Sequence, residues 1–402
     1  MGRDAGILFA ARSIRTFSYG SLSLVLALYL AGKGFSAAQI GLVFTATLVE
    51  DAVFTALLAS LAERWGSRRV LVLSAIVLSL GGAALALAEA PALVAVVAIL
   101  GTLSPSGQEA GPFTALEQAL LADAVPQDRR TRAFAWYSVF GFLPAALGAL
   151  AAGGWRAWAR GAGLTPLAAD RWLLWLFAGS GLVLALIYAR FPGPSDRASE
   201  PRRAPAFGLH RSRRVVLELS ALQAVDALAG GFIVQALLVY WFHLRFGVGP
   251  EQLGPLFFGT NVLSAVSFFI AARVAERFGL LRTMVFSHLP SNVLLLLVPL
   301  AGSFPVAAAL LLARHVLSQM DVPTRQAYTM ALVAPDERAA AAGFTTSARG
   351  LAQAVAPTFT GYALGSAATG IPFFLAGGLK IVYDLALWRA FRARPAPEDP
   401  NR

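Results

Sequence analysis

The chain has 402 residues, of which 57% are hydrophobic and only 14% are charged, and its mean hydropathy is +0.64. Soluble domains carry about 25% charged residues, so an ordinary soluble core is excluded. The formal net charge of +11 could point to nucleic acid, but the basic residues are spread over short loops between apolar runs. The chain contains no cysteine, which excludes disulfides and thiolate metal sites.

Twelve apolar runs follow one another along the chain, each near or above the roughly 20 residues that a membrane-spanning helix needs. They lie at 7–31, 38–60, 70–88, 92–123, 133–153, 171–190, 216–244, 252–273, 283–302, 304–333, 340–367 and 370–391. Arg12 and Arg15 interrupt the first run, so we expect a retained helix there and not a cleavable signal peptide. The sequence predicts an all-α integral membrane protein with twelve transmembrane helices.

Arginines gather in four of the loops between these runs. The loops that carry them are those at 61–69, 129–132, 191–215 and 273–282, and all four fall on one side of the membrane if both termini do. By the positive-inside rule this side is the cytoplasm. We therefore expect both termini to be cytoplasmic, in a plasma or inner membrane.

One loop occurs twice. LAERWGSRR occupies 61–69 and VAERFGLLR occupies 274–282, so that an offset of 213 residues separates Glu63 from Glu276. The same offset relates Pro144 to Pro357 in the fifth and eleventh runs. Agreement between loops and helices predicts two homologous six-helix bundles, at 1–190 and 216–402, joined by a cytoplasmic linker at 191–215.

The duplicated loop resembles the motif Gly-x-x-x-Asp-Arg-x-Gly-Arg-Arg of the major facilitator superfamily, and the resemblance extends over essentially the whole chain. The matching residues are Glu63, Arg64, Gly66, Arg68 and Arg69 in the first copy, and Glu276, Arg277 and Gly279 in the second. Glu63 replaces the usual Asp, Ala59 the leading Gly, and Ser67 a basic residue. The resemblance implies two six-helix bundles around a central cavity lined by the first, fourth, seventh and tenth helices. It also implies that these loops gate alternating access; the alternative is a signal for topology alone.

The tenth run places charges inside an otherwise apolar helix. Its polar residues recur at steps of four and three, which puts them on one face of a single helix kinked at Pro323: Arg314, Ser318, Asp321, Arg325 and Tyr328. Each ionisable group at membrane depth costs roughly 2.5–3.5 kcal/mol on insertion scales, so such groups normally face a bundle interior or an aqueous cavity. This face is the strongest candidate site for substrate or ions.

The other three expected cavity helices carry polar faces as well. The candidates are Arg12, Arg15 and Tyr19 in the first helix, Glu109 and Glu117 in the fourth, and Gln223 and Asp226 in the seventh. Snorkelling to lipid headgroups is the alternative for the two arginines, and a permanent salt bridge is the alternative for the acids.

Several further residues have a structural interpretation. We expect Arg349 to be structural, and Lys380 and Asp384 to form an ion pair across one helical turn. Aromatic residues near run ends usually belong to the interfacial belt, as we expect for Trp136, Tyr137, Trp241 and Trp388.

These observations predict a secondary active transporter. No histidine has metal-site spacing and no Gly-rich phosphate loop is present, so we expect no enzyme activity, no metal, no cofactor and no use of ATP. Buried carboxylates that can change protonation state point to a proton-coupled transporter of a small solute, with efflux favoured. The alternatives are a uniporter, or a membrane-embedded enzyme or lipid-handling protein on the same scaffold. We expect a monomer in the lipid bilayer, without nucleic acid.

Overall fold

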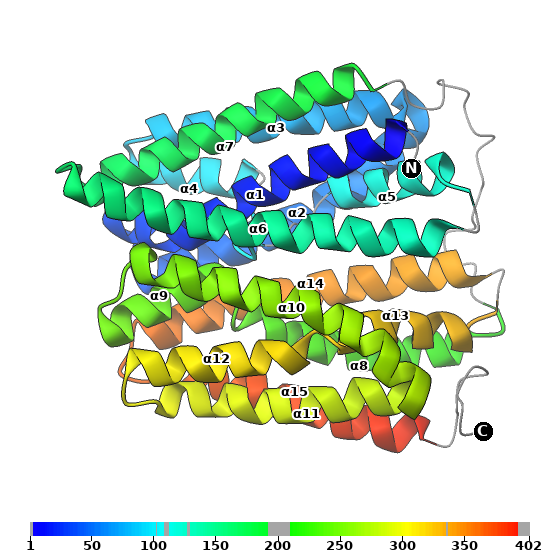
Figure 1. The fold of residues 1–402 in the computed structure, drawn as a ribbon. Coiled ribbons are helices and arrows are strands. Elements are labelled where there is room, and N and C mark those ends of the chain that lie inside the picture. Colours follow the sequence, from blue (N-terminus) through cyan, green and yellow to red (C-terminus); the bar gives the residue numbers. More distant parts are fainter. Residues whose placement is uncertain are drawn as a thin grey trace. The chain divides into compact units, whose positions relative to one another are not determined.

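The computed structural model describes residues 3–101, 103–107, 112–126, 129–191, 210–334 and 337–392. Every regular element within these ranges is helical (Figure 1). Nine helical segments there are long and apolar enough to cross a membrane. Of the twelve predicted runs, the three outside this group are the fourth, the tenth and the eleventh. The fourth and tenth are interrupted, and the eleventh forms one long helix, α14 (Arg338–Leu364). The seventh is also interrupted, but it is counted in this group as one segment, Arg213–Phe246.

Three of the expected single helices are divided. The fourth run forms α4 (Pro91–Leu100) and α5 (Pro112–Ala124), the seventh forms α8 (Arg213–Gly231) and α9 (Gln235–Phe246), and the tenth forms α12 (Phe304–Ser318) and α13 (Asp321–Leu332). The prediction of one kinked helix through Pro323 was therefore wrong. Pro323 has no backbone N–H, and its ring would meet the carbonyl of Gln319 in a continuous helix, so α12 ends before it.

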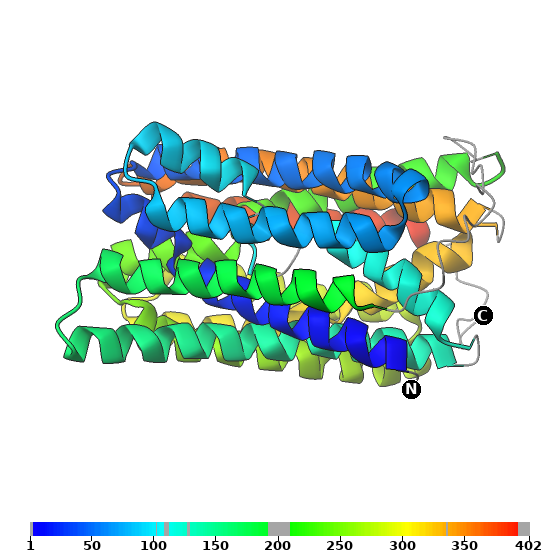
Figure 2. The ribbon, with the colours of Figure 1, turned by 90° about the horizontal axis from the view of Figure 1, so that it is seen from above.

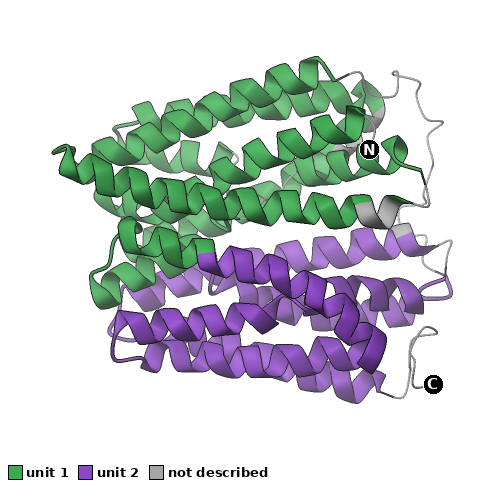
Figure 3. Cartoon of the chain, viewed as in Figure 1, with its two compact units in different colours: residues 1–202, 234–258 green, residues 203–233, 259–402 purple. Residues whose placement is uncertain are grey.

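The chain divides into two compact units (Figure 3). Unit 1 comprises residues 1–202 and 234–258, and unit 2 comprises residues 203–233 and 259–402. Their boundary in the seventh run coincides with the break between α8 and α9. The two bundles expected at 1–190 and 216–402 remain a prediction.

Unit 1 is organised around α1 (Arg3–Gly32). This helix lies between α6 (Arg130–Gly161) and α7 (Pro166–Ala189), as Figure 2 shows. Small residues make the close packing possible, because a Cβ at Gly148 would stand 2.0 Å from the carbonyl oxygen of Phe17. The remaining long helices of the unit are α2 (Ala37–Trp65) and α3 (Ser67–Leu87), and α3 packs along α7.

Unit 2 repeats this packing with α8 in the place of α1. α8 packs against α14 and α15 (Ile371–Phe391), and a Cβ at Gly231 would stand 2.2 Å from the carbonyl oxygen of Gln353. α11 (Leu280–Leu297) packs along α15 as α3 does along α7, and it continues into a short 3-10 helix, η2 (Val298–Leu300). α10 (Pro250–Phe278) precedes α11. In each unit one central helix packs against two others, α1 against α6 and α7 in unit 1 and α8 against α14 and α15 in unit 2.

The two copies of the repeated loop have the same backbone conformation. Gly66 ends α2 with φ +86° and ψ 140°, and Gly279 ends α10 with φ +88° and ψ 159°. This region is open to glycine and strained for other residues, which explains why both copies keep the glycine. Arg68 donates a hydrogen bond to the carbonyl of Ala189 at the end of α7.

The other predicted loop residues are exposed at the surface, except for Glu63. Arg64 and Arg69 are exposed, as are Glu276 and Arg277, whereas the side chain of Glu63 is outside the described residues. Glu276 lines a pocket of about 290 Å³ together with Pro323 at the start of α13. The second loop thus borders the helix that carries Asp321, and the gating role of both loops remains a prediction.

Candidate functional site

A buried ion pair in unit 1 joins four helices. Arg15 of α1 donates to both carboxylate oxygens of Glu117 of α5, at 2.9 and 2.6 Å. The hydroxyls of Tyr137 (α6) and Tyr188 (α7) donate to the same carboxylate at 2.6 and 2.5 Å. The side chains of Arg15 and Glu117 are both 0% exposed. Arg15 therefore forms an internal salt bridge and does not snorkel.

The other unit 1 candidates surround this pair. Arg12 donates to the carbonyl oxygen of Tyr137 at 2.9 Å, and its guanidinium lies 4.0 Å from the centre of the Tyr137 ring. The expectation that Tyr137 belongs to the interfacial belt was wrong, because it is buried beside Arg12 and Glu117. Tyr19 is buried with its ring edge against Phe177. Glu109 lies outside the described residues.

The interruption of the fourth helix forms a polar junction within unit 1. Gly107 adopts φ +68°, and a Cβ there would stand 2.7 Å from the side-chain oxygen of Gln235 in α9. Gln235 donates to the hydroxyl of Ser23 in α1 at 2.8 Å, and the N–H of Ala236 donates to the carbonyl of Pro105 at 3.0 Å. The junction brings together helices that the family resemblance assigned to the cavity, although Ser23 and Gln235 were not among the predicted site residues.

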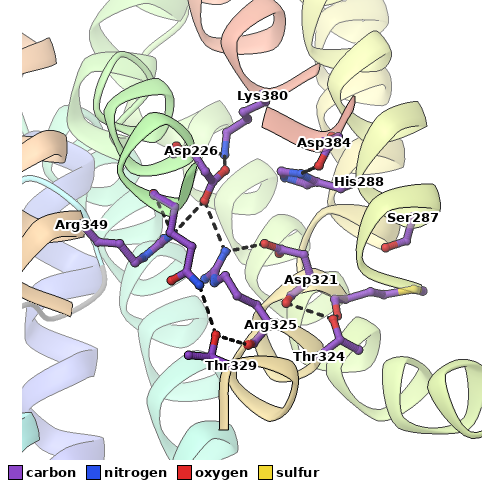
Figure 4. Close-up of polar contacts among 12 residues, drawn as sticks. Asp226, Ser287, His288, Asp321, Thr324, Arg325, Thr329, Arg349, Lys380 and Asp384 are labelled. Atoms are coloured by element: carbon purple, nitrogen blue, oxygen red, sulfur yellow. Dashed lines mark hydrogen bonds and ion pairs between the residues drawn. The ribbon is translucent and has the colours of Figure 1, made fainter. Parts of the chain in front are cut away.

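Unit 2 contains a carboxylate that three cations share (Figure 4). Asp226 of α8 accepts from Lys380 of α15 at 2.5 Å, from Arg349 of α14 at 3.0 Å and from Arg325 of α13 at 3.3 Å. Asp226 itself is only 3% exposed. The sequence pattern predicted Asp226 and Arg325 as site residues, whereas Arg349 and Lys380 were expected to be structural.

Arg325 also pairs with a second carboxylate. Its Nη1 atom lies 2.6 Å from Asp321 Oδ2, one turn earlier on α13, as the spacing predicted. The same nitrogen therefore serves both Asp321 and Asp226, and Figure 4 shows it between them. Gln223 donates to the hydroxyl of Thr329 at 3.2 Å. Tyr328 lies apart from these charges, in an apolar cluster where it packs edge-on against Phe391.

The expected pair of Lys380 with Asp384 is replaced by other partners. Asp384 is hydrogen-bonded to Nδ1 of His288 at 2.9 Å and accepts from Nδ2 of Asn292 at 2.9 Å. Both partners belong to α11, so this carboxylate joins α15 to α11 while Lys380 reaches α8. The i, i+4 spacing was present, but tertiary partners displaced the local pair.

Arg314 is the remaining predicted cation of this region. It lies in the last part of α12 and is 6% exposed. Among the described residues no carboxylate lies within ion-pairing distance, and Nη1 lies 3.5 Å from Nε2 of His315. The tenth run thus carries one paired and one unpaired arginine.

Interrupted spanning helices and ionisable groups in the interior of a helical bundle define the class, a polytopic α-helical membrane protein built around internal polar sites. A family model described as Major Facilitator Superfamily matches residues 8–313 and 222–402, and the chain belongs to this family. The twelve-helix major facilitator fold predicted from the sequence is thereby confirmed. Members of this family are membrane transporters that move small molecules through the bilayer.

Individual proteins are similar over nearly the whole chain. An uncharacterised membrane protein of Saccharomyces cerevisiae, YJR124C, is 28% identical over 417 residues, covering 96% of this chain and 93% of that protein. The crystal structure of the nucleoside transporter NupG is similar with a TM-score of 0.74, at 14% identity, over 97% of this chain and 100% of that one. The xylose transporter XylE from E. coli gives 0.76 at 13% identity, over 99% of both chains. At these identities the solved structures show the fold.

Proposed function

We propose that the protein is a secondary active transporter that moves a small solute by alternating access and couples this movement to protons. The observation that carries the proposal is the shared cation Arg325, whose Nη1 contacts both Asp226 and Asp321. Asp321 pairs with Arg325, whereas Asp226 also has Arg349 and Lys380 as partners. An unpaired charge is costly in the membrane interior, so the sharing of Arg325 depends on the charge of Asp321. Protonation of Asp321 would release Arg325 to Asp226 alone, and loss of that proton would restore the shared arrangement.

Solved structures of similar fold support the proposal of transport. One structural neighbour is a D-xylose-proton symporter, with a TM-score of 0.74 at 14% identity, and NupG is a nucleoside transporter. We propose a polar solute for this chain by analogy of fold. Buried charged groups also occur in each unit, around Glu117 in unit 1 and around Asp226 in unit 2. Export remains the favoured direction from the sequence, and uniport is the alternative.

The proposed orientation follows the distribution of arginine. Short cytoplasmic loops carry an excess of Lys and Arg. The loop with Arg64, Arg68 and Arg69 is rich in arginine, and so is its repeat with Arg277 and Arg282. We therefore propose a monomer in a plasma or inner membrane, with both termini in the cytoplasm. Accessibility of single cysteines introduced near either terminus, in a chain that has none, would test the orientation directly.

Proton coupling is tested by replacing both members of the pair Asp321–Arg325 with neutral residues that cannot bind or release the coupling proton. In Asp321→Asn combined with Arg325→Gln, both members of the local pair become neutral, so folding is recovered relative to Asp321→Asn alone. Reconstituted in proteoliposomes with a solute identified by a thermal-shift screen, this double variant should exchange solute but not accumulate it with a pH gradient.

The control is Thr324→Val. The Thr324 hydroxyl donates only to backbone carbonyls of Met320 and Asp321 at 2.8 and 3.0 Å, so its loss should leave coupling intact. Full gradient-driven accumulation by the double variant would show that the pair is structural and would refute the coupling role. Accumulation by the wild type without any response to a pH gradient would favour another ion.

A further inference from the structure

Arg314 is a buried cation that no carboxylate neutralises within the described part of unit 2. Arg314 is 6% exposed, and its Nε atom has no hydrogen-bond acceptor. The contact with His315 does not supply a negative charge, because an imidazole side chain is neutral or positive. Its Nδ1 lies 3.1 Å from the hydroxyl of Ser264, and its Nε2 faces the guanidinium. A guanidinium cannot give up its proton in ordinary conditions, so the charge persists and requires a counter-charge.

Ser318 provides a second unsatisfied group on the same face. It follows Arg314 by four residues, is 3% exposed, and its hydroxyl has no partner in the described chain. Residues four apart on a helix lie one above the other, so the guanidinium and the hydroxyl present donors to the same side of α12. Buried donors are normally satisfied, and two unsatisfied ones within a turn of each other indicate a missing acceptor.

The two groups stand at the end of an interrupted helix. α12 ends at Ser318 and α13 begins at Asp321, and the corresponding run of the first half is also interrupted, between α4 and α5. In transporters with internal repeats, interruptions at corresponding positions of the two halves mark substrate sites near the membrane midplane. The position of Arg314 and Ser318 therefore agrees with a ligand site.

The charged side chains around the break between α12 and α13 carry a net positive charge. Arg314, Arg325, Arg349 and Lys380 supply four positive charges, whereas Asp226, Asp321 and Asp384 supply three negative ones. These four cations stand on four helices. Arg325, Arg349 and Lys380 contact Asp226 directly, and Arg314 lies close enough to Asp321 and Asp226 to interact with them at longer range. The region carries an excess positive charge that an anion would neutralise.

We propose that Arg314 and Ser318 bind the oxyanion group of an anionic solute, a carboxylate or a phosphate. The guanidinium offers two parallel N–H donors that match the two oxygens of such a group, and the hydroxyl donates a third hydrogen bond. This proposal rests on the proposed transport function and names the substrate class of its site. It adds that the solute brings the negative charge that the protein lacks beside α12.

The test measures binding, so it does not depend on transport. Purified protein in an uncharged detergent is titrated with citrate, with inorganic phosphate, and with sodium chloride at equal ionic strength, and its thermal unfolding is followed. An oxyanion at a hundredfold excess over its Kd raises the ratio of folded to unfolded protein about 100-fold. We expect such stabilisation for citrate or phosphate beyond the chloride control, and its loss in Arg314→Gln and its weakening in Ser318→Ala.

The unliganded stability of the variant separates a ligand site from a structural arginine. Because Arg314→Gln removes a buried charge that has no acidic partner, the variant without oxyanion should be at least as stable as the wild type. The matched control is Arg273→Gln, an exposed arginine of α10, which should keep the oxyanion response. Repeating the titration in nanodiscs of phosphatidylcholine, with and without phosphatidylglycerol, distinguishes a free oxyanion from a lipid headgroup.

Two results would overturn the assignment. If neither oxyanion stabilises the wild type more than chloride does, and added phosphatidylglycerol does not either, the charge of Arg314 is balanced from within the protein. If stabilisation persists in Arg314→Gln, the anion binds elsewhere. Both results leave proton-coupled transport untouched, whereas Arg314-dependent binding without any flux would refute the transport function and leave the site standing.

Discussion

Replacing Glu117 by glutamine should destabilise unit 1 by about 3–5 kcal/mol, the usual cost of leaving one member of a buried ion pair without its partner. Glu117 receives four hydrogen bonds, two from Arg15 and one each from Tyr137 and Tyr188. A glutamine side chain offers one oxygen, and its amide N–H groups would face the guanidinium, so at least one donor of Arg15 would lose its acceptor. The charge of Arg15, at 0% exposure, would remain unneutralised.

The assay is reversible unfolding in mixed detergent micelles, followed by the fluorescence of the tryptophans. Combining Glu117→Leu with Arg15→Met should recover most of the loss, since buried pairs can be replaced by apolar residues at little cost. Arg214→Gln is the control, because Arg214 pairs with Glu218 at the surface, where its side chain is 86% exposed, and such pairs contribute about 0–1 kcal/mol. A Glu117→Gln variant within about 1 kcal/mol of the wild type would refute the argument.

Three further predictions follow from the packing and the loops. Gly148→Leu should prevent stable folding because a Cβ there would stand 2.0 Å from a backbone oxygen, whereas Gly154→Leu on the same helix meets nothing within 4 Å and should fold; size-exclusion profiles would decide. Gly66→Ile should impair transport, measured as flux, while leaving insertion intact, because φ is +86° there, and unchanged turnover would contradict the gating role. The N–H groups of residues 210–212 lower the pKa of Glu337 from 4.5 to about 2, so this contribution to stability is present above about pH 4.5 and is lost as the pH falls toward about 2. Glu337→Gln should remove it at neutral pH, seen as faster hydrogen exchange of those amides, and equal exchange in both proteins would contradict it.

Periodicity along one helix was enough to predict the pair of Asp321 and Arg325, and repetition in the sequence was enough to find the two matching loops. Asp321 and Arg325 lie one turn apart in the structure as their spacing required, and Gly66 and Gly279 share one backbone conformation. These predictions succeeded because they depend on neighbours within a few residues. The helical repeat fixes which side chains share a face whatever the rest of the chain does.

Partners on other helices were beyond this reasoning. Lys380 binds Asp226, 154 residues away, in preference to Asp384 one turn away. A local pair competes with every tertiary alternative, and only the packing of α8 against α15 decides between them. Trp241 shows the same limit, because its place near a run end predicted the interfacial belt, whereas it is 1% exposed and packs against Phe242 and Phe246.

The salt bridge between Arg15 and Glu117 also constrains how the protein is made. Arg15 precedes Glu117 by 102 residues, so at synthesis rates of about 5–20 residues per second the first helix waits roughly 5–20 s for its partner to emerge from the ribosome. During that interval α1 carries an uncompensated arginine whose placement at membrane depth costs roughly 2.5–3.5 kcal/mol. We therefore expect the first helix to be held at the insertion machinery, or shifted toward the membrane surface, until the fourth and fifth spans are inserted beside it.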